Sequence, residues 1–330
     1  MYKILAVSVD ELWLKGKNRK VYIQAIKRHI KSVVKAFHSD PFTCLNENQR
    51  LILESDIPFN EELILSLQKV PGINAITPSQ KISLDFDEII PVVTKELENL
   101  DCELSTFKVI TNRSNKQFPM TSMEMSRELG ALILQNFSNL KVDVKSPEIQ
   151  VRIKVATEKI YISVKKYKGI GGLPCGTSGN IVTMLSGGFD SPVASYLMSK
   201  RGCKQSFIFF YSYPYVGDEV KEKILEISKI LGKYQYRSKL YIVPFGEIQN
   251  EISKSCFEEY RTLLFRKYMV DCANLLADRI NADAICTGDA LGQVSSQTIY
   301  NISAIDRYSK RPILRPLIGT NKVEIISLSK

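Results

Sequence analysis

The chain has 330 residues, 44% of them hydrophobic and 24% charged, a balance that can form a buried core and is not typical of disorder. At this length we expect two or three domains. The 45 basic residues outnumber the 35 acidic ones, so the formal net charge is +10. No apolar run approaches the roughly 18 residues of a membrane span, and the first residues lack a signal-peptide pattern, so we expect neither a membrane protein nor a secreted one.

Cysteine and histidine usage excludes several kinds of metal site. The seven cysteines are scattered and contain no C-x-x-C pair, which argues against a zinc ribbon, an iron–sulfur cluster of ordinary spacing and a disulfide scaffold. The two histidines are too few for most His-rich metal chemistry. We therefore expect a protein of the reducing cytoplasm.

Positive charge is concentrated in two parts of the chain. Residues 1–50 hold ten basic and four acidic side chains, and residues 105–180 hold twelve and five, whereas residues 51–104 hold three and eleven. This pattern favours a surface for a polyanion, and the alternative is a lysine-rich solvated surface. The densest cluster, from Lys15 to Lys20, precedes a helical pattern and would suit phosphate oxygens.

The first half of the chain predicts two small α+β units. Apolar spacing indicates a strand at 3–8, a helix at 18–37, a strand at 51–55 and a helix at 59–69, the β-α-β-α order of a ferredoxin-like fold. The second unit has expected helices at 86–99 and 121–137 and strands at 107–112, 149–156 and 159–166.

Local signals support two of these predictions. Thr121 with Glu124 three residues on is a capping-box pattern for the second helix. The last two strands alternate with period two around Thr157-Glu158, as a hairpin does. A turn-rich segment at 169–180, containing several glycines, then marks the main boundary.

From residue 181 short strands alternate with helices, the pattern of a doubly wound parallel sheet. The expected strands are 181–185, 206–212, 240–245, 282–288 and 311–317. The expected helices are 191–201, 217–231, 257–280 and a short last helix capped by Asn321.

The segment Ser186-Gly-Gly-Phe-Asp-Ser191 lies between the first of these strands and its helix. Anions bind at such helix N-termini, and two glycines let backbone N–H groups surround a phosphate. Ser191 is also a candidate helix cap. Walker and Rossmann glycine patterns are absent. The alternative is an ordinary Gly-Gly turn with a serine cap.

Asp190 is the unusual residue of this loop. A carboxylate beside phosphates is repulsive unless a divalent cation stands between them, so Asp190 suggests a Mg²⁺ site. Asp289, after a later strand, is either a second acidic group near this metal or a helix cap.

Four segments, in this order along the chain, resemble the tRNA 4-thiouridine synthetase (tRNA sulfurtransferase) family. SGGFDS is the signature of PP-loop ATP pyrophosphatases, and residues 169–202 and 287–298 resemble this one family among them. Residues 107–133 resemble its RNA-binding THUMP domain, and residues 11–22 its ferredoxin-like domain. The implied domains are ferredoxin-like at 1–58, THUMP at 59–168, a linker at 169–180 and PP-loop ATP pyrophosphatase at 181–330.

The resemblance implies an enzyme that uses ATP and Mg²⁺ to adenylate the O4 of a tRNA uridine, after which sulfur replaces AMP. Asp190 would be catalytic and the metal ligand. The residues implied to bind the nucleotide are Met184, Leu185, Ser186, Gly187, Gly188, Asp190, Ser191, Phe209, Phe210, Arg266, Gly288 and Gln297. The two phenylalanines have core packing as their alternative role. The residues implied to bind the tRNA backbone are Lys15, Lys17, Arg19, Arg113, Lys116 and Arg127.

The resemblance leaves sulfur handling open. Family members commonly continue through a segment with a sulfur-transfer cysteine, which we expect to lie beyond Lys330, so an external persulfide carrier or sulfide is the expected donor. Cys256, then Cys175, are the local candidates, with an inert buried thiol as the alternative for each. A tRNA-binding protein that keeps ATP binding but has lost thiolation, or modifies RNA differently, is the alternative function. A homodimer is also left open.

Overall fold

The structure is a computed structural model that describes all residues except 1, 12–15, 17, 48–49 and 101–104. The chain divides into two compact units. The first contains residues 1–9, 34–68 and 73–169, and the second contains residues 10–33, 69–72 and 170–330. Helix α1 (Arg19–Phe37) carries residues of both units.

The first unit contains the ferredoxin-like strands that the sequence predicts, together with two that it does not. The elements are β1 (Tyr2–Val9), β2 (Phe42–Glu47), β3 (Arg50–Phe59), α2 (Glu61–Leu67) and β4 (Ile73–Ile82). With α1 they run in the order β-α-β-β-α-β, so the four-element prediction lacked β2 and β4. Strand β4 contains Pro78, paired with Leu5 of β1, and a proline argues against a strand when only the sequence is read.

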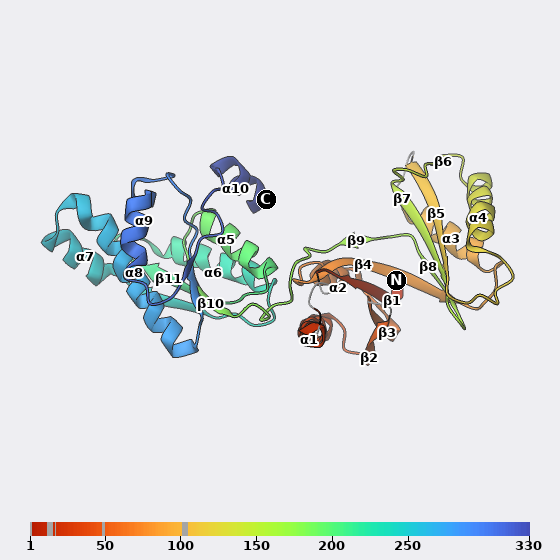
Figure 1. The fold of residues 1–330 in the computed structure, drawn as a ribbon, viewed down its shortest axis with the longest axis horizontal. Helices are drawn as coiled ribbons and strands as arrows, with labels where there is room; N and C mark the ends of the chain where they lie inside the picture. Colours follow the sequence, from red (N-terminus) through yellow and green to blue (C-terminus); the bar gives the residue numbers. More distant parts are fainter. Residues whose placement is uncertain (1, 12–15, 17, 48–49, 101–104) are drawn as a thin grey trace. The chain divides into compact units, whose positions relative to one another are not determined.

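The same sheet continues into the THUMP-like half of the unit. Its elements are α3 (Ile89–Glu98), β5 (Ser105–Arg113), α4 (Ser122–Asn136), β6 (Leu140–Val142), β7 (Ile149–Val155), β8 (Ile160–Ser163) and β9 (Tyr167–Lys168). Within the described residues the strand order is β2-β3-β1-β4-β8-β7-β5-β6, with β9 on β4 (Figure 1). The capping box of Thr121 and Glu124 is confirmed, and so is the β7–β8 hairpin.

The second unit contains the predicted parallel sheet, in the order β12-β11-β10-β13-β14. These strands are β10 (Asn180–Leu185), β11 (Lys204–Tyr211), β12 (Leu240–Pro244), β13 (Ala284–Cys286) and β14 (Ile313–Leu314). The helices are α5 (Asp190–Lys200), α6 (Asp218–Gly232), α7 (Gly246–Ser255), α8 (Glu258–Ile280), α9 (Ile299–Asp306) and α10 (Lys322–Ser329), with a short 3₁₀ turn η2 at Ser295–Gln297. The expected helices did not include α7 or α9. Within the described part of the chain, no helix combines the length and apolarity that a membrane span requires.

Apolar clusters cover both faces of the parallel sheet. Val182 of β10 packs with Ile285 of β13 and with α8 on one face, whereas Leu185 packs with Phe207 and α6 on the other. Because all five strands are parallel, their carboxyl ends share one edge, and the loops at this edge are the expected place for a ligand.

Candidate nucleotide and RNA sites

The Ser186–Ser191 loop joins β10 to α5 at this carboxyl edge. The Ser186 backbone N–H donates to Ser191 Oγ at 2.8 Å, and the two serine hydroxyls lie 3.0 Å apart. Helix α5 begins at Asp190, and Phe189 is its N-cap without a side-chain hydrogen bond. The predicted capping role of Ser191 is therefore wrong, because its hydroxyl closes the loop instead.

The glycines of this region have different surroundings. A Cβ on Gly188 would meet nothing closer than Ser186 Oγ at 3.8 Å, so the protein itself leaves space there for an anion near the backbone. A Cβ on Gly288, in contrast, would lie 2.5 Å from the Ser191 backbone nitrogen. Only glycine therefore lets the loop after β13 lie against the start of α5, and the nucleotide contact expected of Gly288 stays a prediction.

Asp190 forms an ion pair that the sequence did not predict. Lys322 Nζ, in the first turn of α10, lies 2.8 Å from Asp190 Oδ1 and 3.0 Å from Oδ2, and Gln293 Nε2 lies 3.3 Å from Oδ2. Lys322 directly follows Asn321, the predicted cap of the last helix, at the same sheet edge. This position next to a predicted helix start was the only sequence signal that pointed to Lys322.

A Mg²⁺ ion fits Asp190 only together with phosphates. The described residues contain no group of three or more acidic, His or Cys side chains that could hold a metal ion. However, Mg²⁺ is often bound by one or two carboxylates plus substrate phosphates and water. A single carboxylate at the start of α5, beside a loop whose Gly188 has open space around it, meets that requirement.

Asp289 caps no helix and is instead part of a buried charge cluster. Its Oδ1 accepts from Arg266 at 2.5 Å, and its Oδ2 accepts from Thr287 Oγ1 at 2.8 Å and from Arg315 Nε at 3.2 Å. Burial raises the pKa of Asp289, but Arg266, the Thr287 hydroxyl and Arg315 together outweigh burial and hold the pKa below its usual value. Asp289 is thus a buried carboxylate whose two oxygens each face a cation.

Arg266 lies next to the predicted contact Gln297. Its NH1 donates to the carbonyl and hydroxyl oxygens of Ser296 at 3.3 and 3.2 Å. Gln297 Nε2 lies 3.4 Å from Asp289 Oδ1. A guanidinium has five N–H donors, and these contacts with Ser296 and Asp289 account for three of them. The side chain can still donate to a nucleotide.

The rings of Phe209 and Phe210 lie in the protein core. Phe209 is 5% exposed and packs with Leu185, whereas Phe210 is 9% exposed and packs on the opposite face of the sheet, where Met184 is half-buried. The alternative of core packing is therefore correct for both rings. A nucleotide contact from these two residues would have to use their backbone, at the carboxyl end of β11.

The described cysteines, six of the seven, are all free thiols. Burial raises the pKa of Cys175 and Cys286 to about 12 and that of Cys203 to about 11, so these thiols are poor nucleophiles at neutral pH. Cys256 is half-buried at the C-terminal cap of α7, and its carbonyl oxygen accepts from Arg261 Nε at 3.1 Å. Cys256 stays a candidate carrier, and Cys175 is disfavoured.

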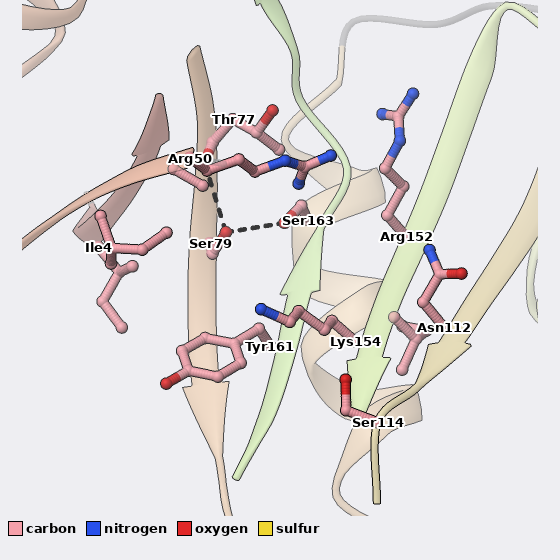
Figure 2. Close-up of a pocket in the computed structure, with 13 residues that line it drawn as sticks. Ile4, Arg50, Thr77, Ser79, Asn112, Ser114, Arg152, Lys154, Tyr161 and Ser163 are labelled. Atoms are coloured by element: carbon pink, nitrogen blue, oxygen red, sulfur yellow. Dashed lines mark hydrogen bonds between the residues drawn. The ribbon is translucent and has the colours of Figure 1, made fainter. Parts of the chain in front are cut away.

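A second candidate site is a basic pocket of about 310 Å³ on one face of the first unit's sheet (Figure 2). Three cationic side chains line it, Arg50 of β3 and Arg152 and Lys154 of β7. Burial and the nearby Arg50 guanidinium lower the pKa of Arg152, as expected for cations close together. The lining residues include no acidic side chain and several polar ones: Thr77, Ser79, Asn112, Ser114, Tyr161 and Ser163. This composition suits an anion.

The residues predicted to bind RNA differ from those of the pocket. Lys15 and Lys17 lie outside the described residues. Arg113 donates through NH1 to the carbonyl oxygens of Phe118 and Met120 at 2.8 and 2.7 Å, so it holds a turn. The remaining three are Arg19, which is half-buried, and Lys116 and Arg127, which are exposed.

Sequence comparison matches three family models to this chain. The model of the thiamine biosynthesis protein (ThiI) matches residues 176–330, the THUMP domain matches residues 85–165, and the ThiI ferredoxin-like domain matches residues 4–77. Curated proteins named "Probable tRNA sulfurtransferase" are similar over the whole chain. The one from Clostridium kluyveri is 39% identical over 333 residues, and the one from Acetivibrio thermocellus is 40% identical over 337 residues. The chain covers 85% and 84% of their lengths.

Two solved structures are similar along the chain. A crystal structure of a 4-thiouridine synthetase–RNA complex with bound ATP has a TM-score of 0.88 and 32% identity, over 100% of this chain and 84% of that one. The structure of PH1313 from Pyrococcus horikoshii has a TM-score of 0.74 over 99% of this chain and 98% of that one. Its 23% identity supports the fold alone.

Proposed function

This chain belongs to the ThiI family of tRNA sulfurtransferases, and from its geometry we propose how it converts a tRNA uridine to 4-thiouridine with ATP. The observation that carries the proposal is the Ser186–Ser191 loop, which leaves space beside its glycines and has the Asp190–Lys322 pair next to it. The predicted domain boundaries, with the PP-loop domain at 181–330, form part of the proposal.

In the first step the uridine O4 attacks the α-phosphate of ATP, a P–O bond forms, and pyrophosphate leaves as the α–β bond breaks. The proton of uridine N3 is lost. The loop N–H groups and Lys322 would stabilise the negative charge that develops on the phosphates. We propose that Asp190 holds a Mg²⁺ ion that accompanies ATP, and this ion would neutralise phosphate charge.

In the second step hydrosulfide attacks C4. A persulfide carrier would serve in its place only with a second thiol, which attacks the carrier sulfur, breaks the S–S bond and forms a disulfide as the transferred sulfur stays on C4. With hydrosulfide the C4–S bond forms, the C4–O bond breaks, AMP leaves, and the sulfur proton moves to N3. The raised pKa values of Cys175, Cys203 and Cys286 argue against these buried thiols as sulfur carriers, which leaves Cys256 or an external donor. Free thiols also agree with the reducing cytoplasm as the compartment.

We propose that the basic pocket of the first unit, together with Lys116 and Arg127, binds the tRNA backbone. Arg50, Arg152 and Lys154 would contact phosphates and position the RNA without reading its bases. Every proposed nucleotide contact comes from residues 184–322 of one chain, so the homodimer that the resemblance leaves open is not needed for the ATP chemistry.

The test is the mass spectrum of nucleosides from tRNA incubated with the protein, ATP and sulfide. We expect 4-thiouridine, and we expect its formation to require ATP. Lys322→Gln should reduce the rate at least tenfold, whereas Lys310→Gln, which removes an exposed lysine of the same unit, should not. ATP binding without any 4-thiouridine would instead support the alternative, a tRNA-binding protein that has lost thiolation.

A further inference from the structure

A pocket of about 540 Å³ lies at the amino edge of the parallel sheet, opposite the edge that carries the Ser186–Ser191 loop. Its lining includes Asn180 and Lys204, the first residues of β10 and β11, which pair with each other. The loop follows Leu185, the last residue of β10. Five residue steps of about 3.3 Å therefore separate this amino-edge pocket from the loop by about 17 Å. The pocket is thus distinct from the proposed nucleotide site.

Three cationic side chains line the amino-edge pocket, and its lining residues include no acidic one. The cations are Lys204 of β11 and Arg237 and Lys239, which precede β12. Asp283 lies at the same edge but does not line the pocket, and its Oδ2 accepts from the Asn180 N–H at 2.8 Å. The pocket therefore concentrates positive charge, as a site for an anion does.

These cations have no carboxylate partner, unlike several other basic side chains of the same unit. Lys229 pairs with Glu226 and Lys267 pairs with Asp271, each at 2.6 Å. Among the described residues, the three cations of the amino-edge pocket form no ion pair. An anion that entered the pocket would therefore not have to displace a carboxylate of the protein.

A buried glutamine holds the segment that carries two of these cations. Gln235 is 4% exposed; its Oε1 accepts from the Gln205 N–H at 2.8 Å, and its Nε2 donates to the Gln205 carbonyl oxygen at 3.1 Å. Gln205 is 1% exposed, and its own Nε2 donates to the Ser195 carbonyl oxygen and the Ser199 hydroxyl. Arg237 follows two residues after Gln235. The backbone that presents the charges is therefore fixed on the core, as a binding site requires.

The sequence of this segment also has the composition of a nucleic-acid contact. Residues 233–241, KYQYRSKLY, interleave basic and aromatic side chains. Surfaces that bind single-stranded nucleic acids combine cations for phosphates with aromatic rings for bases. Tyr241 lines the pocket, and Lys204 Nζ lies 6.0 Å from the centroid of the Tyr236 ring. Ser206 and Ser238 line it too, and their hydroxyl groups can donate to phosphate oxygens.

We propose that the amino-edge pocket binds backbone phosphates of the tRNA, at the edge of the sheet opposite the ATP loop. The inference rests on the proposed use of tRNA as the substrate. Phosphate contacts fix the position and orientation of a nucleic acid without reading its bases. One tRNA would reach from the pocket to the loop, a span of about 17 Å. The pocket thus holds the substrate and takes no part in the chemistry of ATP.

The test is fluorescence anisotropy of labelled tRNA with the full chain at several salt concentrations. Replacing the three pocket cations by glutamine should lower the slope of log K against log salt by about two to three units. The matched control replaces one exposed arginine and two exposed lysines of the same unit that do not line the pocket. These are Lys254, Arg307 and Lys310. The control removes the same charge and should change the slope by less than one unit.

A second variant separates the effect of charge from an effect on folding. Lys204→Arg, Arg237→Lys and Lys239→Arg together keep all three charges and should keep the slope within one unit of the wild type. Equal losses of slope in the glutamine variant and in the control would overturn the inference. A loss of the same size in the charge-retaining variant would also overturn it, because charge would not be the cause.

Pyrophosphate release at saturating tRNA gives an independent readout. The glutamine variant should release pyrophosphate at nearly the wild-type rate, with a KM for tRNA raised at least tenfold. A variant that keeps its tRNA affinity and loses pyrophosphate release would overturn the inference. A wild-type protein that binds tRNA with the expected salt dependence but forms no 4-thiouridine would contradict the proposed function and leave the pocket as a tRNA site.

Discussion

The basic pocket of the first unit makes a quantitative prediction about RNA binding. Replacing Arg50, Arg152 and Lys154 by glutamine removes three cations that line a cavity with no acidic side chain. Each lost phosphate contact lowers the slope of log K against log salt by about 0.7 for single-stranded nucleic acid and about 0.9 for a duplex. The triple variant should therefore lose about two to three units of slope if all three cations contact phosphates.

The expected effect is large enough to measure at ordinary salt concentrations. Between 50 and 200 mM salt, a slope change of this size alters the affinity ratio of wild type to variant by about 20- to 40-fold. The assay is fluorescence anisotropy of labelled tRNA at several salt concentrations. Pyrophosphate release at saturating tRNA should be nearly unchanged, because the three residues lie outside the proposed ATP site.

A matched control variant distinguishes a specific phosphate site from a non-specific effect of the total positive charge. Lys95, Lys141 and Lys145 are exposed lysines of the same unit and do not line the pocket. Replacing these three by glutamine removes the same charge and should change the slope by less than one unit. Equal losses in the two triple variants would refute the pocket as a phosphate site and leave only a generally basic surface.

Four further predictions follow from single side chains. His29 is buried with a pKa of about 4, below its usual 6.5, so the unfolded chain binds a proton that the folded one does not. The free energy of unfolding, measured with urea, should therefore fall by about 3 kcal/mol from pH 7 to pH 4, and His29→Phe should remove this part of the pH dependence. Asp190→Asn should lower Mg·ATP turnover at least tenfold without changing tRNA affinity, and wild-type pyrophosphate release would contradict the metal assignment. Gly288→Ala should raise KM for ATP about tenfold because its Cβ would lie 2.5 Å from the Ser191 nitrogen, whereas Gly319→Ala, with open space, should not. Cys256→Ser should keep sulfide-driven thiolation, and loss only with a persulfide-donor protein would identify it as the carrier.

Local sequence signals predicted the elements that depend on neighbouring residues. The Thr121–Glu124 capping box is one case, because both partners lie within one helical turn. The strand, loop and helix around Ser186–Ser191 are another. Even there, the role predicted for Ser191 was wrong. A serine that caps a helix and a serine whose hydroxyl closes the preceding loop have the same local sequence. Only the structure shows that the Ser191 hydroxyl accepts from the Ser186 N–H.

The rest of the candidate sites depends on contacts between distant residues. Lys322 reaches Asp190 across 132 positions, and Arg315 reaches Asp289 across 26. Neither separation matches a helix or strand period, so neither pairing can be recognised from the sequence. The two cations of β7, Arg152 and Lys154, did leave a signal, because they alternate with buried residues on one strand and therefore share the opposite face.

The two ion pairs at the nucleotide edge differ in a way that separates their roles. The Arg266 and Asp289 side chains are 19% and 9% exposed, whereas those of Lys322 and Asp190 are 44% and 25% exposed. Breaking a buried pair leaves a desolvated charge and costs about 3–5 kcal/mol, but an accessible pair contributes only about 0–1 kcal/mol. The Asp289 cluster is therefore suited to hold its partners still through the reaction. The Lys322–Asp190 pair can exchange partners at little cost, as the proposed mechanism requires: Lys322 would turn to a phosphate oxygen and Asp190 to the cation that accompanies ATP. The same edge thus combines a fixed, buried charge cluster with an exposed ion pair whose partners can be exchanged.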